Sequence, residues 1–220
     1  VEEGPFGEYT GYRTSPRDFR VTFRVNCITY RNNATMTISN MGVPQDEGQL
    51  LRSFSLGLEL EKLLKSQGIP VTGVYMHPRS THHMMIVGVK PTYSGIAQQI
   101  AQLAFGSKLG PWFHMVMVVD DKTDIYNWDE VYHAFCTRCH PANGIHIYKN
   151  TTGTPLYPFA TPHERKHSIG SKVVFDCLWP TDWDKINDVP TLVSFKHVYP
   201  KDIQDKVLAN WTAYGYPPVK

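Results

Sequence analysis

An almost unbroken apolar run at residues 112–119 constrains the fold of this chain more than any other feature, and it stops at the acidic pair Asp120-Asp121. The run has the length of a strand, and a strand without polar alternation is typically buried on both faces of its sheet. Helices usually cover the faces of such a sheet. The run therefore predicts a strand inside a layered α/β domain.

Hydrophobic periodicity predicts the other elements. Alternating or continuous apolar residues indicate strands, and a period near 3.6 bounded by capping residues indicates helices. We expect strands at 21–30, 35–39, 71–76, 83–89 and 172–178, and helices at 46–68, 94–105, 128–138 and 201–214. Residues 141–170, rich in Gly, Pro and His, are expected to form a long, functional loop. Strands interleaved with helices predict the α/β class.

Composition argues against two classes of partner. Of the 220 residues, 41% are hydrophobic, which is enough to build a real core. The 22 basic and 20 acidic residues leave a net charge of +2 and no basic cluster long enough to follow a phosphate backbone, so nucleic acid is not an expected partner. The longest apolar runs fall far short of the roughly 20 residues that a transmembrane helix needs, so no membrane span is expected.

The start of the chain and its cysteines bear on its context. The chain begins at Val1 without a signal peptide, so we expect it to be the C-terminal part of a longer polypeptide. Four cysteines are too few for a disulfide framework in a chain of this length, and free thiols indicate an intracellular, cytoplasmic protein. The cysteines are Cys27, Cys136, Cys139 and Cys177.

Two carboxylates lie five positions apart in the opening motif Glu3-Gly4-Pro5-Phe6-Gly7-Glu8. Pro5 lacks an N–H, and Gly4 and Gly7 tolerate backbone angles that other residues avoid, so the motif is expected to curl rather than form a helix. A curl can aim both carboxylates at one point, and paired carboxylates are a common device for moving protons. The alternative is a surface turn with two solvated acids.

The motif Cys136-Thr137-Arg138-Cys139-His140 has the spacing of covalent haem attachment. It falls at the end of an expected helix and no export signal accompanies it. We therefore do not favour haem.

Histidine and aspartate clusters are weaker candidates for metal sites. His163 and His167 have the spacing of a metal clamp on a helical face, but a loop is expected there and no third ligand is evident. His82 and His83 begin an expected strand, where adjacent side chains point to opposite faces and cannot share a ligand. Asp120, Asp121 and Asp124 lack the Gly and the terminal Glu of a calcium loop, so we interpret them as caps and turns.

Five spaced blocks, taken together, resemble the UbiD family of decarboxylases, especially its fungal ferulic/cinnamic acid decarboxylase branch. The blocks are residues 3–12, 25–34, 118–139, 170–174 and 206–212. The match covers nearly the whole chain and implies the C-terminal portion of such an enzyme. Residues 1–45 would be the end of a flavin-binding split β-barrel with the acidic active-site loop. Residues 46–200 would form the α/β domain of association, a layered α/β/α domain with a mixed sheet, and 201–220 the C-terminal helix and tail.

The resemblance implies a cofactor and a reaction. UbiD-type enzymes use prenylated FMN, which forms an adduct with an unsaturated or aromatic acid and accepts the electrons released with CO2. Glu8 matches the proton donor, and Glu3 matches the other acid of a Glu-Arg-Glu network. The Arg lies upstream in the family. So do the residues that hold a divalent metal (Mn or Mg) and K⁺ beside the flavin phosphate.

The same resemblance assigns the other site residues. Lys172 aligns with a lysine near the flavin phosphate, with a solvated lysine at a strand start as the alternative. Tyr9 and Met41 should face flavin or substrate. Arg52 stands where the cinnamate branch has an apolar pocket residue, so it either faces away or binds a polar or second acidic group. Tyr216 is a candidate substrate contact, with a solvated tail residue as the alternative.

These inferences predict non-oxidative decarboxylation of an aromatic or α,β-unsaturated carboxylic acid with prenylated FMN, in a homo-oligomer that is a dimer or larger. The alternative is a non-catalytic oligomerisation domain, because the chain lacks the Arg and the metal ligands. A flavin oxidoreductase would need reducing equivalents, and no nicotinamide-binding motif is visible.

Overall fold

The structure is a computed structural model that describes residues 1–14 and 16–218. The chain divides into two compact units, Val1–Thr181 and Asp182–Lys220. The first unit contains the sheet and the acidic motif. Each unit is described by itself below.

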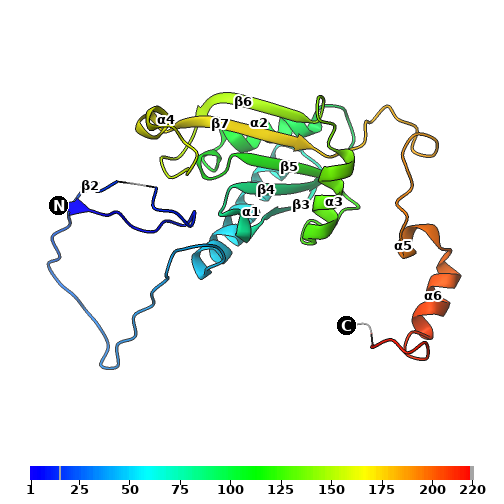
Figure 1. Ribbon diagram of the computed structural model, residues 1–220, viewed down its shortest axis with the longest axis horizontal. Coiled ribbons are helices and arrows are strands. Elements are labelled where there is room, and N and C mark those ends of the chain that lie inside the picture. Colours follow the sequence, from blue (N-terminus) through cyan, green and yellow to red (C-terminus); the bar gives the residue numbers. More distant parts are fainter. Residues whose placement is uncertain (15, 219–220) are drawn as a thin grey trace. The chain divides into compact units, whose positions relative to one another are not determined.

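A five-stranded mixed sheet forms the centre of the first unit (Figure 1). Its strand order is β3-β4-β5-β7-β6. The strands are β3 (Val71–Met76), β4 (Met84–Val89), β5 (Met115–Asp120), β6 (Ile145–Thr152) and β7 (Ile169–Asp176). Strands β4, β5 and β7 run parallel, and β3 and β6 are antiparallel edge strands. The expected α/β class with a mixed sheet is confirmed.

Strand β5 is the buried apolar run that the sequence predicts. Val116 and Val118 belong to the core on one face of the sheet, and Met117 and Val119 belong to the core on the other. These four residues are at most 2% exposed. Both faces of β5 are therefore covered, which explains its lack of polar alternation.

Helices α1 (Glu47–Ser66) and α2 (Ile96–Gly106) cover one face of the sheet, and α3 (Trp128–Arg138) covers the other. Helix α1 begins with a capping box. Asp46 Oδ1 accepts a hydrogen bond from the Gln49 N–H at 2.8 Å, and Gln49 Oε1 accepts one from the Asp46 N–H at 3.0 Å. The expected N-cap at Asp46 is confirmed.

Several loops lie together at the edge of the sheet formed by the amino-terminal ends of the parallel strands β4, β5 and β7. Because parallel strands start at the same edge, the 3-10 turns η1 (Pro78–Ser80) and η2 (Gly110–Trp112), which precede β4 and β5, lie there together. The short helix α4 (Pro162–His167) precedes β7 at the same edge. This edge receives the acidic segment, residues 1–14.

The strands expected at 21–30 and 35–39 do not form, and this prediction is wrong for the chain as described. Residues 20–43 have no regular secondary structure apart from a turn, and Phe23 and Tyr30 are 90% and 80% exposed. Alternation indicates a face suited to burial in a sheet, but a strand also needs a hydrogen-bonded neighbour. Among the described residues, none forms a strand pairing with residues 21–39.

The single long loop expected at 141–170 is also wrong, because the segment contains β6 and α4. Strand β6 is a half-exposed edge strand whose polar composition hides its alternation, and pairing with β7 stabilises it. Helix α4 has only six residues and depends on a capping box between Thr161 and Glu164. Elements this local and this short give weak periodic signals.

The second unit contains the short helices α5 (Phe195–Val198) and α6 (Lys201–Ala209). The helix expected to reach residue 214 ends at Ala209, because the tail folds back. There the Trp211 ring stacks on Tyr216 at 4.6 Å between centroids, and its Nε1 donates to the Pro217 carbonyl at 2.8 Å. None of the helices described is both long enough and apolar enough to cross a membrane.

Two leucines of α1 test the packing of this helix. Leu60 is fully buried, whereas Leu51 is 73% exposed. We expect Leu60→Ala to lower the free energy of unfolding by roughly 2–5 kcal/mol through lost burial and a residual cavity. Leu51→Ala should change it by less than about 0.5 kcal/mol. Urea unfolding followed by circular dichroism measures both, and equal losses would contradict the packing described.

Candidate functional site

The acidic segment forms a compact turn. Strand β1 (Glu2–Glu3) pairs with β2 (Asp18–Phe19), and the Gly11 N–H donates to the Glu8 carbonyl at 2.9 Å. Gly4 and Gly11 have φ of +89° and +81°, a backbone region that glycine adopts without strain. The segment curls as expected. Glu3 lies exposed in β1, whereas Glu8 is half-buried.

Tyr9 attaches this segment to the sheet edge. The residue is 5% exposed, and its ring centroid lies 5.3 Å from that of His82 and 5.9 Å from that of His83. Its carbonyl accepts a hydrogen bond from Gln49 Nε2 at 2.8 Å. Burial raises the pKa of the Tyr9 phenol. The residue that follows Glu8 is thus held by α1 and by the loop before β4.

The buried residues His82, His83 and Tyr157 and the half-buried His114 form a group that we call the histidine cluster. The His83 and His114 rings are 4.8 Å apart, and Tyr157 packs edge-on against them at 5.1 and 4.9 Å. Burial lowers the pKa of His83 to about 3 and that of His114 to about 4. Both imidazoles are therefore neutral near pH 7.

The sequence interpretation of His82 and His83 is wrong. His82 has φ of +66° and lies in the loop before β4, not in a strand. The alternation of a strand therefore does not apply, and both rings reach Tyr9. His114 lies near them because η2 and β5 start at the same edge. Only this topology brings the three histidines together, and no spacing in the sequence indicates it.

Arg52 lies next to the acidic segment. Its guanidinium carbon is 4.6 Å from the Trp112 ring centroid and 5.9 Å from that of Tyr9, within range of a cation–π contact. The residue is half-buried. Within the described chain no carboxylate forms an ion pair with it. Arg52 thus supplies an uncompensated positive charge beside Tyr9.

Lys172 is buried inside the first unit. It is 2% exposed, and its Nζ donates to the Gly110 carbonyl and, at 3.1 Å, to the Phe113 carbonyl. Burial lowers its pKa to about 8. The solvated alternative is wrong. The contact with flavin phosphate stays a prediction, and in this structure the ammonium fixes η2, the turn that carries Trp112.

Two other predicted residues are more exposed. Met41 is 47% exposed, and its carbonyl would lie 3.6 Å from a Cβ placed on Gly7, so it borders the acidic motif. Tyr216 belongs to the second unit, where it stacks on Trp211 and is 54% exposed. The roles of both residues stay predictions.

Arg165 of α4 holds the far end of the acidic segment. Its guanidinium donates to the carbonyls of Thr14 and Pro155, both at 2.8 Å, and to that of Pro158 at 3.0 Å. Its Nε donates to the Ala160 carbonyl at 3.0 Å. One side chain therefore connects the acidic segment to the loop before α4. No motif in the sequence marks Arg165, because backbone carbonyls can belong to any residue.

The structure therefore brings together five of the features that the sequence singles out. Glu8 and Tyr9 lie in one turn, with Arg52 over the Tyr9 ring, Met41 beside the motif and the His82-His83 pair against Tyr9. Lys172 lies deeper, under η2. Glu3 stays in the exposed β1 strand, and Tyr216 is in the other unit.

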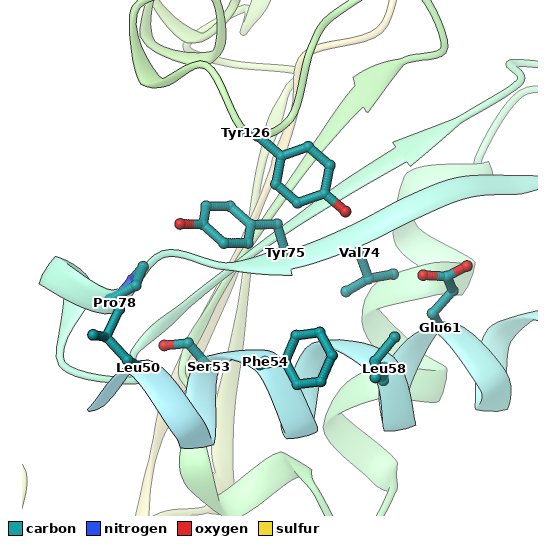
Figure 2. Close-up of a pocket in the computed structure, with 9 residues that line it drawn as sticks. All are labelled: Leu50, Ser53, Phe54, Leu58, Glu61, Val74, Tyr75, Pro78 and Tyr126. Atoms are coloured by element: carbon teal, nitrogen blue, oxygen red, sulfur yellow. The ribbon is translucent and has the colours of Figure 1, made fainter. Parts of the chain in front are cut away.

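A separate apolar groove lies between α1 and the edge strand β3 (Figure 2). Its volume is about 280 Å³, and the rings of Tyr75 and Tyr126 face Phe54 and Leu58 of α1 across it. No predicted site residue lines this groove. Its chemistry is that of a packing surface.

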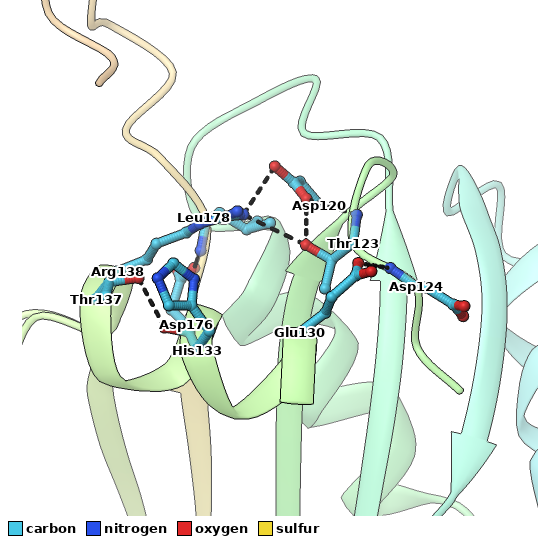
Figure 3. Close-up of polar contacts among 9 residues, drawn as sticks. All are labelled: Asp120, Thr123, Asp124, Glu130, His133, Thr137, Arg138, Asp176 and Leu178. Carbon is cyan, nitrogen blue, oxygen red and sulfur yellow. Dashed lines mark hydrogen bonds and ion pairs between the residues drawn. The ribbon is translucent and has the colours of Figure 1, made fainter. Parts of the chain in front are cut away.

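A polar network lies at the opposite edge of the sheet from the acidic segment, where the parallel strands end (Figure 3). Arg138 pairs with Asp120 at 2.9 Å, and both side chains are 12% exposed. Asp120 also accepts from the Thr123 N–H, and Asp124 accepts from the Tyr126 N–H. The interpretation of Asp120 and Asp124 as caps and turns is confirmed.

The motifs with metal-like spacing do not form a metal centre in the described ranges. Those residues contain no group of three or more His, Cys, Asp or Glu side chains placed to hold an ion. Cys136 is exposed, whereas Cys139 Sγ contacts the Gly144 carbonyl at 3.5 Å. The rings of His163 and His167 on α4 lie 4.6 Å apart between centroids and are tilted by 44° to each other.

Comparison with known proteins decides the family. Residues 49–177 match the family model described as the 3-octaprenyl-4-hydroxybenzoate carboxy-lyase C-terminal domain, and residues 1–44 match the Rift-related domain of the same enzyme. The chain belongs to the UbiD family. The resemblance drawn from the five sequence blocks is confirmed.

Two relatives indicate the extent of the likeness to the UbiD family. Ferulic acid decarboxylase 1 of Saccharomyces cerevisiae is 30% identical over 97% of this chain and 44% of its own length. The closed form of vanillic acid decarboxylase from Sedimentibacter hydroxybenzoicus has a TM-score of 0.81 and 26% identity, covering 96% of this chain and 43% of that one. The chain thus spans less than half the length of these relatives.

A third match shows the fold alone. It is an evolved dimeric form of the UbiD-class enzyme HmfF from Pelotomaculum thermopropionicum in complex with prFMN, with 23% identity and a TM-score of 0.64. It covers 92% of this chain and 41% of that one.

Acidification is expected to destabilise the first unit through the histidine cluster. Folding holds the pKa of His83 and His114 below the ordinary 6.5, so below pH 6.5 the unfolded chain binds more protons and stability falls toward pH 4. We expect about 2 kcal/mol lost per histidine between pH 7.5 and pH 5. His114→Phe should reduce this loss in urea unfolding, whereas the exposed His163→Gln should not. Parallel curves for His114→Phe and the parent protein would contradict the assignment.

Proposed function

We propose that the complete protein decarboxylates an aromatic or α,β-unsaturated carboxylic acid without net oxidation, and that Glu8 delivers the proton that replaces CO2. The observation that carries the proposal is the attachment of the turn that bears Glu8 to the sheet edge through Tyr9. A proton donor must be held at a fixed place before its reaction partner arrives. Membership of the UbiD family and the decarboxylases among its relatives support the reaction class.

Prenylated FMN is the proposed cofactor, and when bound it would supply the sink for the electrons released with CO2. The residues of this chain that border the acidic turn suit a planar, partly anionic group. Arg52 offers a cation that has no carboxylate partner among residues 1–14 and 16–218, and the Trp112 and Tyr9 rings flank it. Arg52, Tyr9 and Met41 would therefore be the residues of this chain that hold the flavin or the substrate.

The neutral histidine cluster adds to this electrostatic arrangement. His83 and His114 carry no charge near pH 7, because burial lowers their pKa far below that value. Arg52 of α1 then supplies a positive charge within 5.9 Å of the Tyr9 ring centroid. A second acidic group of the substrate, distinct from the carboxylate that is lost as CO2, would be attracted toward it.

Glu3 is proposed as the electrostatic partner of Glu8, held by an arginine from another part of the complete protein. Its exposure in β1 leaves the carboxylate accessible to such a partner. Glu2, the neighbouring acid, is already paired with Arg17 at 3.5 Å. Glu3 is therefore free to pair with an arginine of the complete protein, whereas the carboxylate of Glu2 already has a partner.

The proton-donor role is tested by Glu8→Gln in the complete protein reconstituted with prenylated FMN. We expect the rate of CO2 release from ferulic or vanillic acid to fall roughly 100- to 10,000-fold, because an amide cannot act as the acid. Flavin absorbance should remain. The matched control is Glu2→Gln, which removes a surface acid of the same segment. Undiminished turnover in Glu8→Gln would remove Glu8 from the mechanism.

Arg52 is proposed to select substrates with a second acidic group. We expect Arg52→Met to raise KM for 4-carboxycinnamic acid roughly tenfold or more, because a charge-assisted hydrogen bond is lost. KM for cinnamic acid should change less than about threefold. Steady-state kinetics on the two acids measure the difference. Equal changes on both substrates would show that Arg52 does not read the second group.

A further inference from the structure

We infer that Gln49 is a positioning residue for Glu8, because its side-chain amide joins the first turn of α1 to the backbone next to the acid. The inference rests on the proposed role of Glu8. Gln49 is fully buried, and it lies 40 positions from Tyr9 in the sequence. It does not touch the substrate or cofactor, and acts through the Tyr9 backbone.

Each end of the Gln49 amide has one defined task. Oε1 accepts from the Asp46 N–H at 3.0 Å, and Nε2 donates to the Tyr9 carbonyl at 2.8 Å. A reversed amide would place N–H against N–H and oxygen against oxygen, so the two partners fix its orientation. The side chain therefore acts as a rigid bridge between two backbones.

The bridge distinguishes Gln49 from a residue needed only for capping. A glutamate completes a capping box as well as a glutamine does, because the box asks only for an acceptor. The Tyr9 carbonyl needs a hydrogen-bond donor, and an ionised glutamate has no donor to offer. The presence of an amide is thus explained by Tyr9 and not by α1 alone.

The backbone of Gln49 adds a second attachment for the same turn. Its carbonyl lies 3.3 Å from His82 Nε2, and the His82 ring packs on the Tyr9 ring. Gln49 therefore reaches Tyr9 directly through its side chain and indirectly through His82. The turn that bears Glu8 is therefore held at the Tyr9 carbonyl and at the Tyr9 ring. The hydrogen bond to the Tyr9 carbonyl, at 2.8 Å, is shorter than the 3.3 Å contact between Gln49 and His82.

Three variants of the complete, prenylated FMN-loaded protein test this inference. Gln49→Glu keeps the capping box and removes the donor, and Gln49→Met removes both. The control Asp46→Ala weakens the cap, because the backbone N–H of Gln49 loses its acceptor, Asp46 Oδ1. It leaves the contact between the Gln49 side chain and the Tyr9 carbonyl intact. We expect both Gln49 variants to lower kcat at least tenfold with KM changed less than threefold, and Asp46→Ala to stay within twofold of the parent.

Two further readouts separate positioning from a general loss of structure. In both Gln49 variants the solvent deuterium isotope effect on kcat should rise, because proton delivery becomes slower than the other steps. Backbone amide exchange in residues 5–14, measured by mass spectrometry without substrate, should speed up at least tenfold. In Asp46→Ala both quantities should match the parent. The exchange readout holds even for a variant with no measurable turnover.

The outcomes distinguish this inference from the proposed function. If Glu8→Gln abolishes turnover while the Gln49 variants retain parental kcat and amide exchange, Glu8 is the acid and Gln49 does not position it. If Glu8→Gln is fully active, the proposed function itself fails. Equal losses in Gln49→Glu and Asp46→Ala would reduce Gln49 to a capping residue and overturn the inference.

Discussion

The docking of Tyr9 against the amino edge of the parallel strands is the contact on which the rest of the site depends. It joins a segment with almost no secondary structure of its own to a sheet whose central strand, β5, is covered on both faces. A buried ring supplies apolar area, and its carbonyl supplies a directed bond to α1. Without this contact, the turn that bears Glu8 would lose its hydrogen bond to α1.

Electrostatics at this edge depends on burial more than on pairing. Burial keeps two histidines neutral, and Lys172 lies under η2, where its ammonium donates to two carbonyls and lies near the Phe105 and Phe113 rings. Arg52 is half-buried, and among the described residues no carboxylate forms an ion pair with it. Opposite charges at the other edge of the sheet are paired, as Arg138 and Asp120 show. The two edges thus differ in whether a charge remains available to a ligand.

The extent of sequence prediction follows from how local each signal is. β5, the cap at Asp46 and the range of α3 were predictable, since capping residues and apolar runs are read within a few positions. The family and the acid pair came from motifs. The histidine cluster, Gln49 and Arg165 were not predictable, because their partners are backbone carbonyls or rings that only the topology brings near. The prediction of strands at 21–30 and 35–39 failed for another reason, because alternation does not indicate which strand would pair with them.

Arg165 links positions 151 residues apart through its bond to the Thr14 carbonyl. Such a bond closes only after the intervening sheet has assembled, because the chain entropy of so long a loop must first be overcome by other contacts. We therefore expect the acidic segment to become ordered late as the chain folds and to be among the first parts released on unfolding. A segment that precedes the sheet in the sequence would then take its final shape after the sheet.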